Sequence, residues 1–190
     1  MPRAFALLDD HGATAERPAS RLYSGFMREH RCVDASTLDA VWVRVDADLR
    51  AGLHAVLLAD YEWGAKLHGI GQRAGSAPPP IDDHSSLRVL MFSDLAHLSR
   101  DEVEHWLEQQ ADQAAPAGVM DLRCDTDLPT FTAAIARIHA AIRAGETYQV
   151  NYRYRLHGLA YGSPLALYRR LRARQPVAFG ASTMPGSVSP

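Results

Sequence analysis

The spacing of apolar residues changes abruptly near Gly145, and this change is the clearest structural signal in the chain. Over residues 129–144 apolar residues recur every three to four positions, which predicts an amphipathic helix that ends at the glycine. Its apolar face carries Phe131, Ile135, Ile138 and Ile142. From Tyr148 to His157 apolar and polar residues alternate instead, which predicts a strand with one polar face.

Similar patterns predict the other elements. Ser36 and Ser99 are good helix N-caps, and Glu102 stands at the capping-box position relative to Ser99. Further helices are expected to begin at Ser36, Ser99 and Ser163, and strands at residues 5–8, 54–61, 87–92 and 177–183. Polar residues 13–24 are expected to form a connection, and residues 158–162 a turn. Because helices and strands follow one another in no regular βαβ order, the sequence favours an α+β fold with antiparallel pairing.

Two segments have an unusual composition. Residues 69–86 contain three glycines and the run Pro78-Pro-Pro80, which predicts a mobile surface loop. Residues 169–174 hold four arginines on the helix expected after Ser163. Such a basic run is typical of a solvent-exposed helix face.

Composition excludes several classes of function. A net charge of −2 over 190 residues gives no general attraction for nucleic acid or an anionic membrane. No apolar run approaches the roughly 18 residues of a membrane helix, and Asp9 and Asp10 interrupt the N-terminal apolar run, so we expect a cytoplasmic protein. Cys32 and Cys124 are expected to be free thiols. The nine histidines have no metal-binding spacing, so no metal site is predicted.

One motif resembles a known enzyme family. Glu146-Thr-Tyr-Gln-Val-Asn151, placed directly after the predicted helix, is similar to the start of a chorismate-binding core. That core is shared by component I of aminodeoxychorismate synthase (para-aminobenzoate synthase), component I of anthranilate synthase, and the isochorismate and salicylate synthases. The sequence Tyr148-Gln-Val-Asn151 within this motif favours the para-aminobenzoate branch. Weaker similarities occur at Phe5–Asp10, Ser20–Leu22, Asp60–Gly64, Pro164–Tyr168 and Pro176–Ala181.

The resemblance implies a fold and a division of the chain. The expected fold is the N-terminal portion of the component I β-sandwich, truncated, with helices packed outside. Residues 1–118 would form the N-terminal region of component I, and residues 119–190 the incomplete start of the chorismate-binding core. Members of the family are more than twice as long as this chain, so the resemblance implies an N-terminal fragment that is inactive by itself.

The resemblance also implies a reaction and its requirements. The parent enzyme would aminate chorismate to 4-amino-4-deoxychorismate for para-aminobenzoate and folate synthesis, with Mg²⁺ bound and a glutamine amidotransferase subunit (component II) as partner. The acids that hold Mg²⁺, the general acid and the reactive lysine have no counterpart here, so no catalytic residue and no metal ligand are assigned. Lys66, the only lysine, lies in the wrong region.

Gln149 and Asn151 are candidates for the substrate cavity, on the polar face of the predicted strand. A carboxamide both donates and accepts hydrogen bonds, so these two side chains suit a buried polar network around a substrate. The alternative is that this face of the strand is simply exposed to water.

A second candidate site is regulatory. Some relatives bind tryptophan, and the matching positions here are Leu8, Asp10, Ser20, Arg21 and Pro176. Asp10 replaces a family serine, although a carboxylate suits an amino group. The alternative is an ordinary salt bridge between Asp10 and Arg21.

Two other functions stay open at this stage. One is a fragment of an anthranilate synthase-like component I. The other is a non-catalytic module that binds nucleic acid through Tyr148, Tyr152 and Tyr154. Against the second, the alternation places these tyrosines on the face opposite Arg153 and Arg155, and the net charge is unfavourable.

Overall fold

The computed structural model describes residues 4–68, 85–110 and 116–184. The chain divides into two compact units. The first contains residues up to Gln110 together with those from Arg172 onward, and the second contains residues 111–171. Every strand pair is antiparallel and helices occur between the strands, so the predicted α+β class is confirmed.

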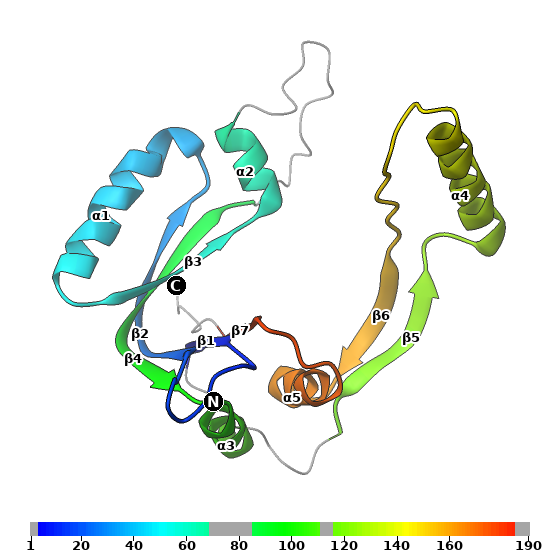
Figure 1. The fold of residues 1–190 in the computed structure, drawn as a ribbon. Helices are drawn as coiled ribbons and strands as arrows, with labels where there is room; N and C mark the ends of the chain where they lie inside the picture. Colours follow the sequence, from blue (N-terminus) through cyan, green and yellow to red (C-terminus); the bar gives the residue numbers. More distant parts are fainter. Residues whose placement is uncertain (1–3, 69–84, 111–115, 185–190) are drawn as a thin grey trace. The chain divides into compact units, whose positions relative to one another are not determined.

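A five-stranded antiparallel sheet forms the centre of the first unit (Figure 1). Its strand order is β3-β4-β2-β1-β7, so a strand from the beginning of the chain lies beside one from its later part. The strands are β1 (Phe5–Asp9), β2 (Ser20–Cys32), β3 (His54–Ala59), β4 (Leu87–Leu98) and β7 (Gly180–Met184). The helices are α1 (Leu38–Arg50), α2 (Tyr61–Leu67), α3 (Arg100–Gln110) and the last turn of α5 (Pro164–Arg174).

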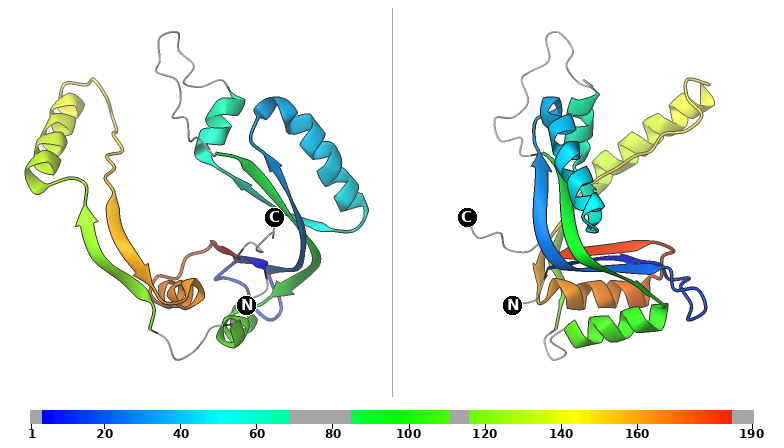
Figure 2. Two further views of the ribbon diagram at one scale, coloured as in Figure 1. Left: turned by 180° about the vertical axis from the view of Figure 1, so that it is seen from behind. Right: turned by 90° about the vertical axis from the view of Figure 1, so that its left-hand side faces the viewer.

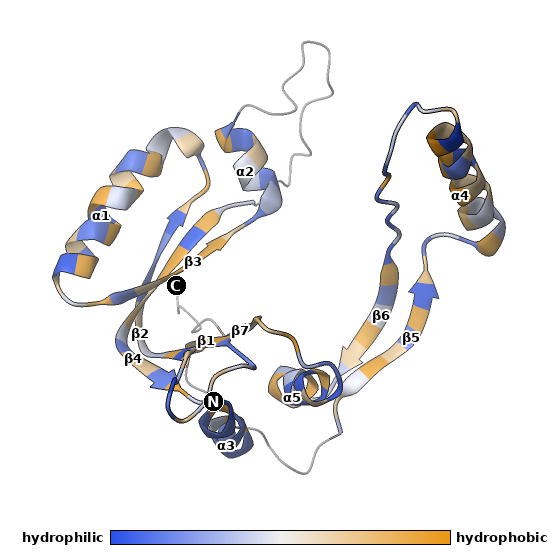
Figure 3. Cartoon of the chain, in the orientation of Figure 1, coloured by the Kyte–Doolittle hydropathy of each residue, from blue (hydrophilic) through white to orange (hydrophobic). Residues whose placement is uncertain are grey.

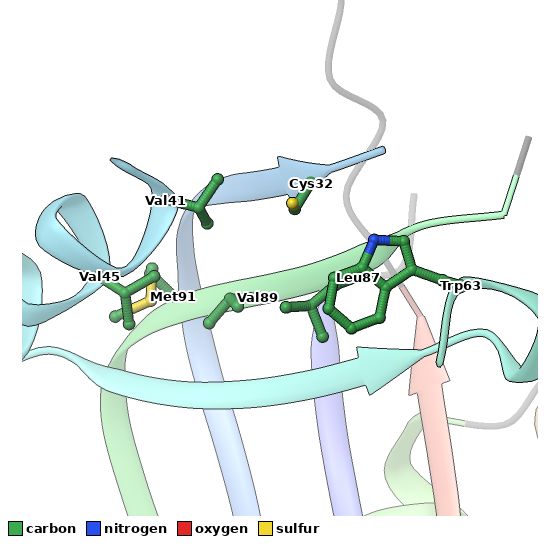
Figure 4. Close-up of a cluster of buried hydrophobic side chains, with 7 residues drawn as sticks. All are labelled: Cys32, Val41, Val45, Trp63, Leu87, Val89 and Met91. Carbon is green, nitrogen blue, oxygen red and sulfur yellow. The ribbon is translucent and has the colours of Figure 1, made fainter. Parts of the chain in front are cut away.

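The first half of β4, residues 87–92, has buried side chains on both faces. Leu87, Val89 and Met91 point toward α1 and α2, which cover one face of the sheet (Figures 2 and 4). Leu90 and Phe92 point the other way and pack in a second cluster. Because side chains alternate along a strand, these consecutive apolar residues supply two cores at once. The members of the first cluster are Cys32, Val41, Val45, Trp63, Leu87, Val89 and Met91, and those of the second are Ala6, Tyr23, Val56, Leu90 and Phe92.

The second unit is built on a two-stranded ribbon. Strand β5 (Gly118–Cys124) pairs with β6 (Leu156–Tyr161), and α4 (Leu128–Arg143) lies between them in the chain. Apolar residues appear along both strands in Figure 3. The side chains that are between 47% and 63% exposed are Val119, Met120, Leu122, Leu156 and Leu159. The ribbon therefore has no apolar cover within the described residues.

The predicted strand from Tyr148 is wrong. A regular strand begins only at Leu156, which pairs with Cys124 at the end of β5. Beyond that pair the two backbones are joined once more, between Asp125 and Arg155, and residues 148–154 pair with no strand in the described chain. Because alternation specifies the faces of a strand but supplies no hydrogen-bonding partner, the pattern alone does not make a strand here.

The predicted turn at residues 158–162 is also wrong for most of its length. Gly158 lies inside β6, where a Cβ atom would come within 2.6 Å of the Val119 side chain. Close packing of the neighbouring strand therefore explains this glycine. Only Gly162 has the left-handed backbone of a turn residue, with φ of 78°.

Strand β2 is missing from the sequence prediction, which assigned residues 13–24 to a polar connection. Gly25 has φ of 67°, and the pairing with β4 shifts by one residue between Phe26 and Arg28. This β-bulge interrupts the alternation by which a strand is recognised. The predicted loop at residues 69–86 lies mostly outside the described residues.

The predicted helix starts are partly confirmed. Ser99 and Glu102 form the expected capping box, with the backbone N–H of Ser99 donating to the carboxylate at 2.7 Å. Ser36 is not an N-cap, because it lies inside a 3₁₀ turn (Ala35–Thr37) that precedes α1. The cap of that turn is Asp34, two residues earlier, whose carboxylate accepts from the Ser36 N–H at 2.9 Å. Helix α4 begins and ends within one residue of its predicted bounds.

Replacing Leu90 by Ala is expected to lower the free energy of unfolding by about 2–5 kcal/mol, because the loss of a fully buried side chain leaves a cavity in the second cluster. Urea denaturation of the purified chain measures this cost. Leu57→Ala on the neighbouring strand is the control, since that side chain is 50% exposed. Equal costs for the two variants would contradict the assigned core.

The capping box predicts a pH dependence. The Ser99 N–H and then its hydroxyl hold the pKa of Glu102 below its ordinary value of 4.5. The ionised cap therefore contributes stability that is fully present above pH 4.5 and is lost as the pH falls through the lowered value.

Thermal unfolding from pH 7 to pH 3 tests this dependence. The difference in stability between the wild type and Glu102→Gln should be constant near neutral pH and shrink in acid. Asp101→Asn, which removes a carboxylate from the same turn but no cap bond, is the control. A difference that grows on acidification would contradict the cap.

Candidate functional site

A hollow of about 550 Å³ lies in the first unit, at the end of β1. Its volume falls within the range of small-molecule sites, roughly 300–1,000 Å³. Three strands supply most of its walls: β1, the start of β2 and the start of β7. The residues that line it are Leu8, Asp9, Asp10, Ala19, Arg21, Phe179, Gly180 and Ala181. We call this hollow the β1 pocket.

Strand register brings these residues together. Leu8 lies opposite Arg21 on one side and opposite Ala181 on the other. Asp9 lies opposite Gly180, which is the first residue of β7. The pocket therefore depends on the pairing of β1 with the next strand, β2, and with β7, which is distant in the sequence.

Three of the five residues expected for the tryptophan-like pocket line the β1 pocket: Leu8, Asp10 and Arg21. Ser20 is fully buried, and its hydroxyl accepts a hydrogen bond from the Asp10 N–H at 3.0 Å. Pro176 is exposed and is not among the lining residues. The structure thus brings four of the five together, although ligand binding at these residues stays a prediction.

The pocket contains charges of both signs. Arg21 is exposed, and the Asp10 carboxylate is partly exposed and accepts from the Gly12 N–H at 2.8 Å. No ion pair joins Asp10 to Arg21 among the residues that the structure describes. The predicted alternative, a salt bridge between these two, is therefore not formed. Both groups face a ligand-sized hollow with the charges that a zwitterion requires.

Asp9 differs from its neighbour because its charge is already matched. It is 6% exposed and receives the Arg172 guanidinium at 2.7 Å. Sequence reasoning missed Asp9, together with Ala19, Phe179, Gly180 and Ala181. Pairing of residues 5–9 with residues 180–184 would have found Asp9, Gly180 and Ala181, but no local pattern reveals that pairing.

The two predicted cavity residues of the second unit are exposed. Gln149 and Asn151 precede β6 in an irregular segment, and neither lines a hollow described here. The backbone carbonyl of Gln149 accepts a hydrogen bond from the Thr147 hydroxyl at 3.0 Å. Their role in a substrate cavity stays a prediction.

A smaller hollow of about 300 Å³ lies in the second unit, where β5 leads into α4. Phe131 packs edge-on against Tyr152 and Tyr154, with ring centroids 5.7 and 6.0 Å apart. The residues that line this hollow are Cys124, Thr126, Asp127, Leu128, Phe131 and Tyr154.

Two carboxylates near this smaller hollow, those of Asp125 and Asp127, accept hydrogen bonds from neighbouring backbone N–H groups. The Arg155 N–H, and then the Thr126 hydroxyl, lower the pKa of Asp125 from its ordinary 3.8. The side chain and then the backbone N–H of Thr130 lower the pKa of Asp127 in the same way. Asp127 is the N-cap of α4. These groups are ionised acceptors at neutral pH, and neither is poised as a general acid.

The described residues do not fit a magnesium ion. No three His, Cys, Asp or Glu side chains of the described ranges lie together as a possible metal site. Mg²⁺ requires oxygen ligands from carboxylates, water and substrate, so we assign it no ligand in this part of the chain. The same described ranges contain no helix whose length and apolarity would suit a membrane crossing.

Comparison with known proteins gives one match. The model of the family described as chorismate binding enzyme matches residues 13–189. No curated protein and no solved structure matches the chain. The family match includes the Glu146–Asn151 motif, strands β2 to β7 and the helices that the structure describes. Since it covers far more than half of the chain, the protein belongs to the chorismate-binding enzyme family.

Proposed function

We propose that this chain is the N-terminal part of component I of an aminodeoxychorismate synthase, which aminates chorismate to 4-amino-4-deoxychorismate on the route to para-aminobenzoate and folate. The family match over residues 13–189 carries the proposal. The sequence motif Tyr148-Gln-Val-Asn151 supports this branch over the anthranilate branch.

The chemistry requires groups that the described residues do not supply. The product carries its amino group at C4, where the hydroxyl of chorismate leaves, so ammonia must form its bond at C4 and a general acid must protonate the departing oxygen. The substrate carboxylates require a cation, because enzyme carboxylates would otherwise repel them. We assign both tasks to a part of the enzyme outside this sequence, where Mg²⁺ would also bind. A glutamine amidotransferase subunit is the proposed source of ammonia.

The exposed ribbon of β5 and β6 supports this division. A two-stranded sheet is marginally stable alone and normally requires a further strand or an apolar cover. Five large apolar side chains of this ribbon are about half exposed or more. We propose that the remainder of the chorismate-binding core packs on them, and that Gln149 and Asn151 line the cavity thus formed.

The β1 pocket is the proposed regulatory site for a zwitterionic amino acid, with tryptophan as the first ligand to test. The Asp10 carboxylate would bind the ammonium group, and the Arg21 guanidinium the carboxylate. Leu8 and Phe179 supply apolar surface for the ring. Phe179 is 82% exposed, so covering it would add to affinity.

The 190-residue chain is expected to form no product from chorismate, an ammonium salt and Mg²⁺, because it lacks the general acid and the metal ligands. Chromatography of the reaction mixture measures this. Turnover by protein free of host enzyme would contradict the proposal that the general acid and the metal ligands lie outside this sequence.

A longer protein that continues this chain through the rest of a component I sequence gives the matched positive test. With the same substrates it should form 4-amino-4-deoxychorismate. Formation of anthranilate instead would place the protein in the other branch of the family. No reaction with chorismate by either protein would contradict the proposed function altogether.

Arg21→Met is expected to weaken tryptophan binding by about tenfold or more, because a charge-assisted hydrogen bond to the ligand carboxylate is lost. Equilibrium dialysis with labelled tryptophan at micromolar protein measures the affinity. Arg44→Met, at an exposed position of α1, is the control and should bind like the wild type. Equal affinities for the Arg21 variant and the wild type would exclude Arg21 from the site.

A further inference from the structure

Arg172 is a buried arginine within the basic run 169–174, which the sequence analysis expects to face solvent. Its side chain is only 9% exposed, which corrects that expectation. Its Nε donates to Asp9 at 2.7 Å, and one terminal nitrogen donates to Glu104 at 2.9 Å. The other terminal nitrogen donates to the Arg100 carbonyl at 3.2 Å. One guanidinium thus joins the last turn of α5 to β1 and α3.

The bond to Asp9 leads directly to the β1 pocket. Asp9 lines the pocket, and its carboxylate lies 3.5 Å from the Ser20 hydroxyl. That hydroxyl accepts from the Asp10 N–H at 3.0 Å. A continuous set of polar contacts therefore runs from Arg172 through Asp9 and Ser20 to the backbone of Asp10.

Burial makes this arrangement sensitive to the loss of one partner. Asp9 is 6% exposed, so its carboxylate has little access to water. Removing the cation from a buried ion pair leaves an uncompensated charge, which costs much more than losing an exposed pair. Asp9 without Arg172 would have to move toward the pocket to regain contact with water.

We propose that Arg172 is a positioning residue for the β1 pocket, with two effects. It fixes the wall formed by Asp9 and Asp10, and it neutralises Asp9 so that Asp10 is the carboxylate offered to a ligand cation. The wall and the last turn of α5 then depend on each other. The identity of the ligand rests on the proposed function, whereas the positioning role rests on the contacts of Arg172.

Hydrogen exchange without ligand tests the first effect. In Arg172→Met the amides of residues 5–10 and 180–184 should exchange about tenfold faster or more, because the wall opens locally. Amides of α1 and β3 should change little. Arg174→Met is the matched control, since Arg174 is exposed on the same helix and has no hydrogen bond or ion pair among the described residues.

Ligand selectivity tests the second effect. Tryptophan carries both charges, whereas tryptamine carries only the ammonium group. In Arg172→Met the negative charge of Asp9 has lost its cation, so the pocket should attract the ammonium group more strongly and repel the ligand carboxylate. The ratio of tryptophan affinity to tryptamine affinity should therefore fall by about tenfold. Arg172→Lys keeps the positive charge but loses the planar set of donors of the guanidinium. This variant should retain most of the affinity ratio, whereas the amides of residues 5–10 should still exchange faster than in the wild type.

The outcomes separate this inference from the proposed function. If the wild type binds neither compound, the proposed ligand is wrong and exchange alone decides the role of Arg172. Unchanged exchange at the wall in both variants would overturn the positioning role. Uniformly faster exchange throughout the first unit would also overturn it, because Arg172 would then serve only general stability. Faster exchange at the wall with an unchanged ratio of tryptophan to tryptamine affinity would overturn the proposal that Arg172 neutralises Asp9.

Discussion

The pairing of β1 with both β2 and β7 is the constraint on which the first unit depends. Phe5, Ala6 and Leu7 are almost fully buried, so the backbone groups of this short strand must find partners inside the protein. Strands β2 and β7 supply them from opposite sides. Since β7 follows α5, this pairing also brings Arg172 against Asp9. The β1 pocket and its charge arrangement are consequences of one strand held between two others.

Sequence patterns predicted those elements whose signal is local. Helix α4 has a complete apolar stripe and a glycine stop, and the Ser99 capping box needs only residues within one turn. The prediction of a strand at Tyr148 was wrong because an alternating pattern does not show whether a partner strand exists. The last residue of β5, Cys124, pairs with the first residue of β6, Leu156, so no strand of the described chain lies opposite the residues before it. Strand β2 was missed because Gly25 and the adjacent bulge break the alternation. The predicted β-sandwich stays a prediction, since its remaining layers would come from beyond the described residues.

The candidate site was predictable in part, through resemblance rather than through pattern. Leu8, Asp10 and Arg21 were expected together and line one pocket. Asp9 and Arg172 were not, because each looks like an ordinary charged surface residue and only the fold buries them against one another. The family match shows a chorismate-binding enzyme. Ligand binding in the β1 pocket and the need for further catalytic groups stay proposals.

The register of β1 against β7 is the most direct test of this account, because the wall formed by Phe179, Gly180 and Ala181 depends on it. Cysteines placed at Leu8 and Ala181, which lie opposite each other, should form a disulfide under mild oxidation, with Cys32 and Cys124 replaced by Ser. Peptide mass spectrometry detects the bond. Cysteines at Leu8 and Ser182 should not link, because one step along a strand turns the side chain to the other face. A disulfide in the second pair and none in the first would contradict the register, and with it the pocket.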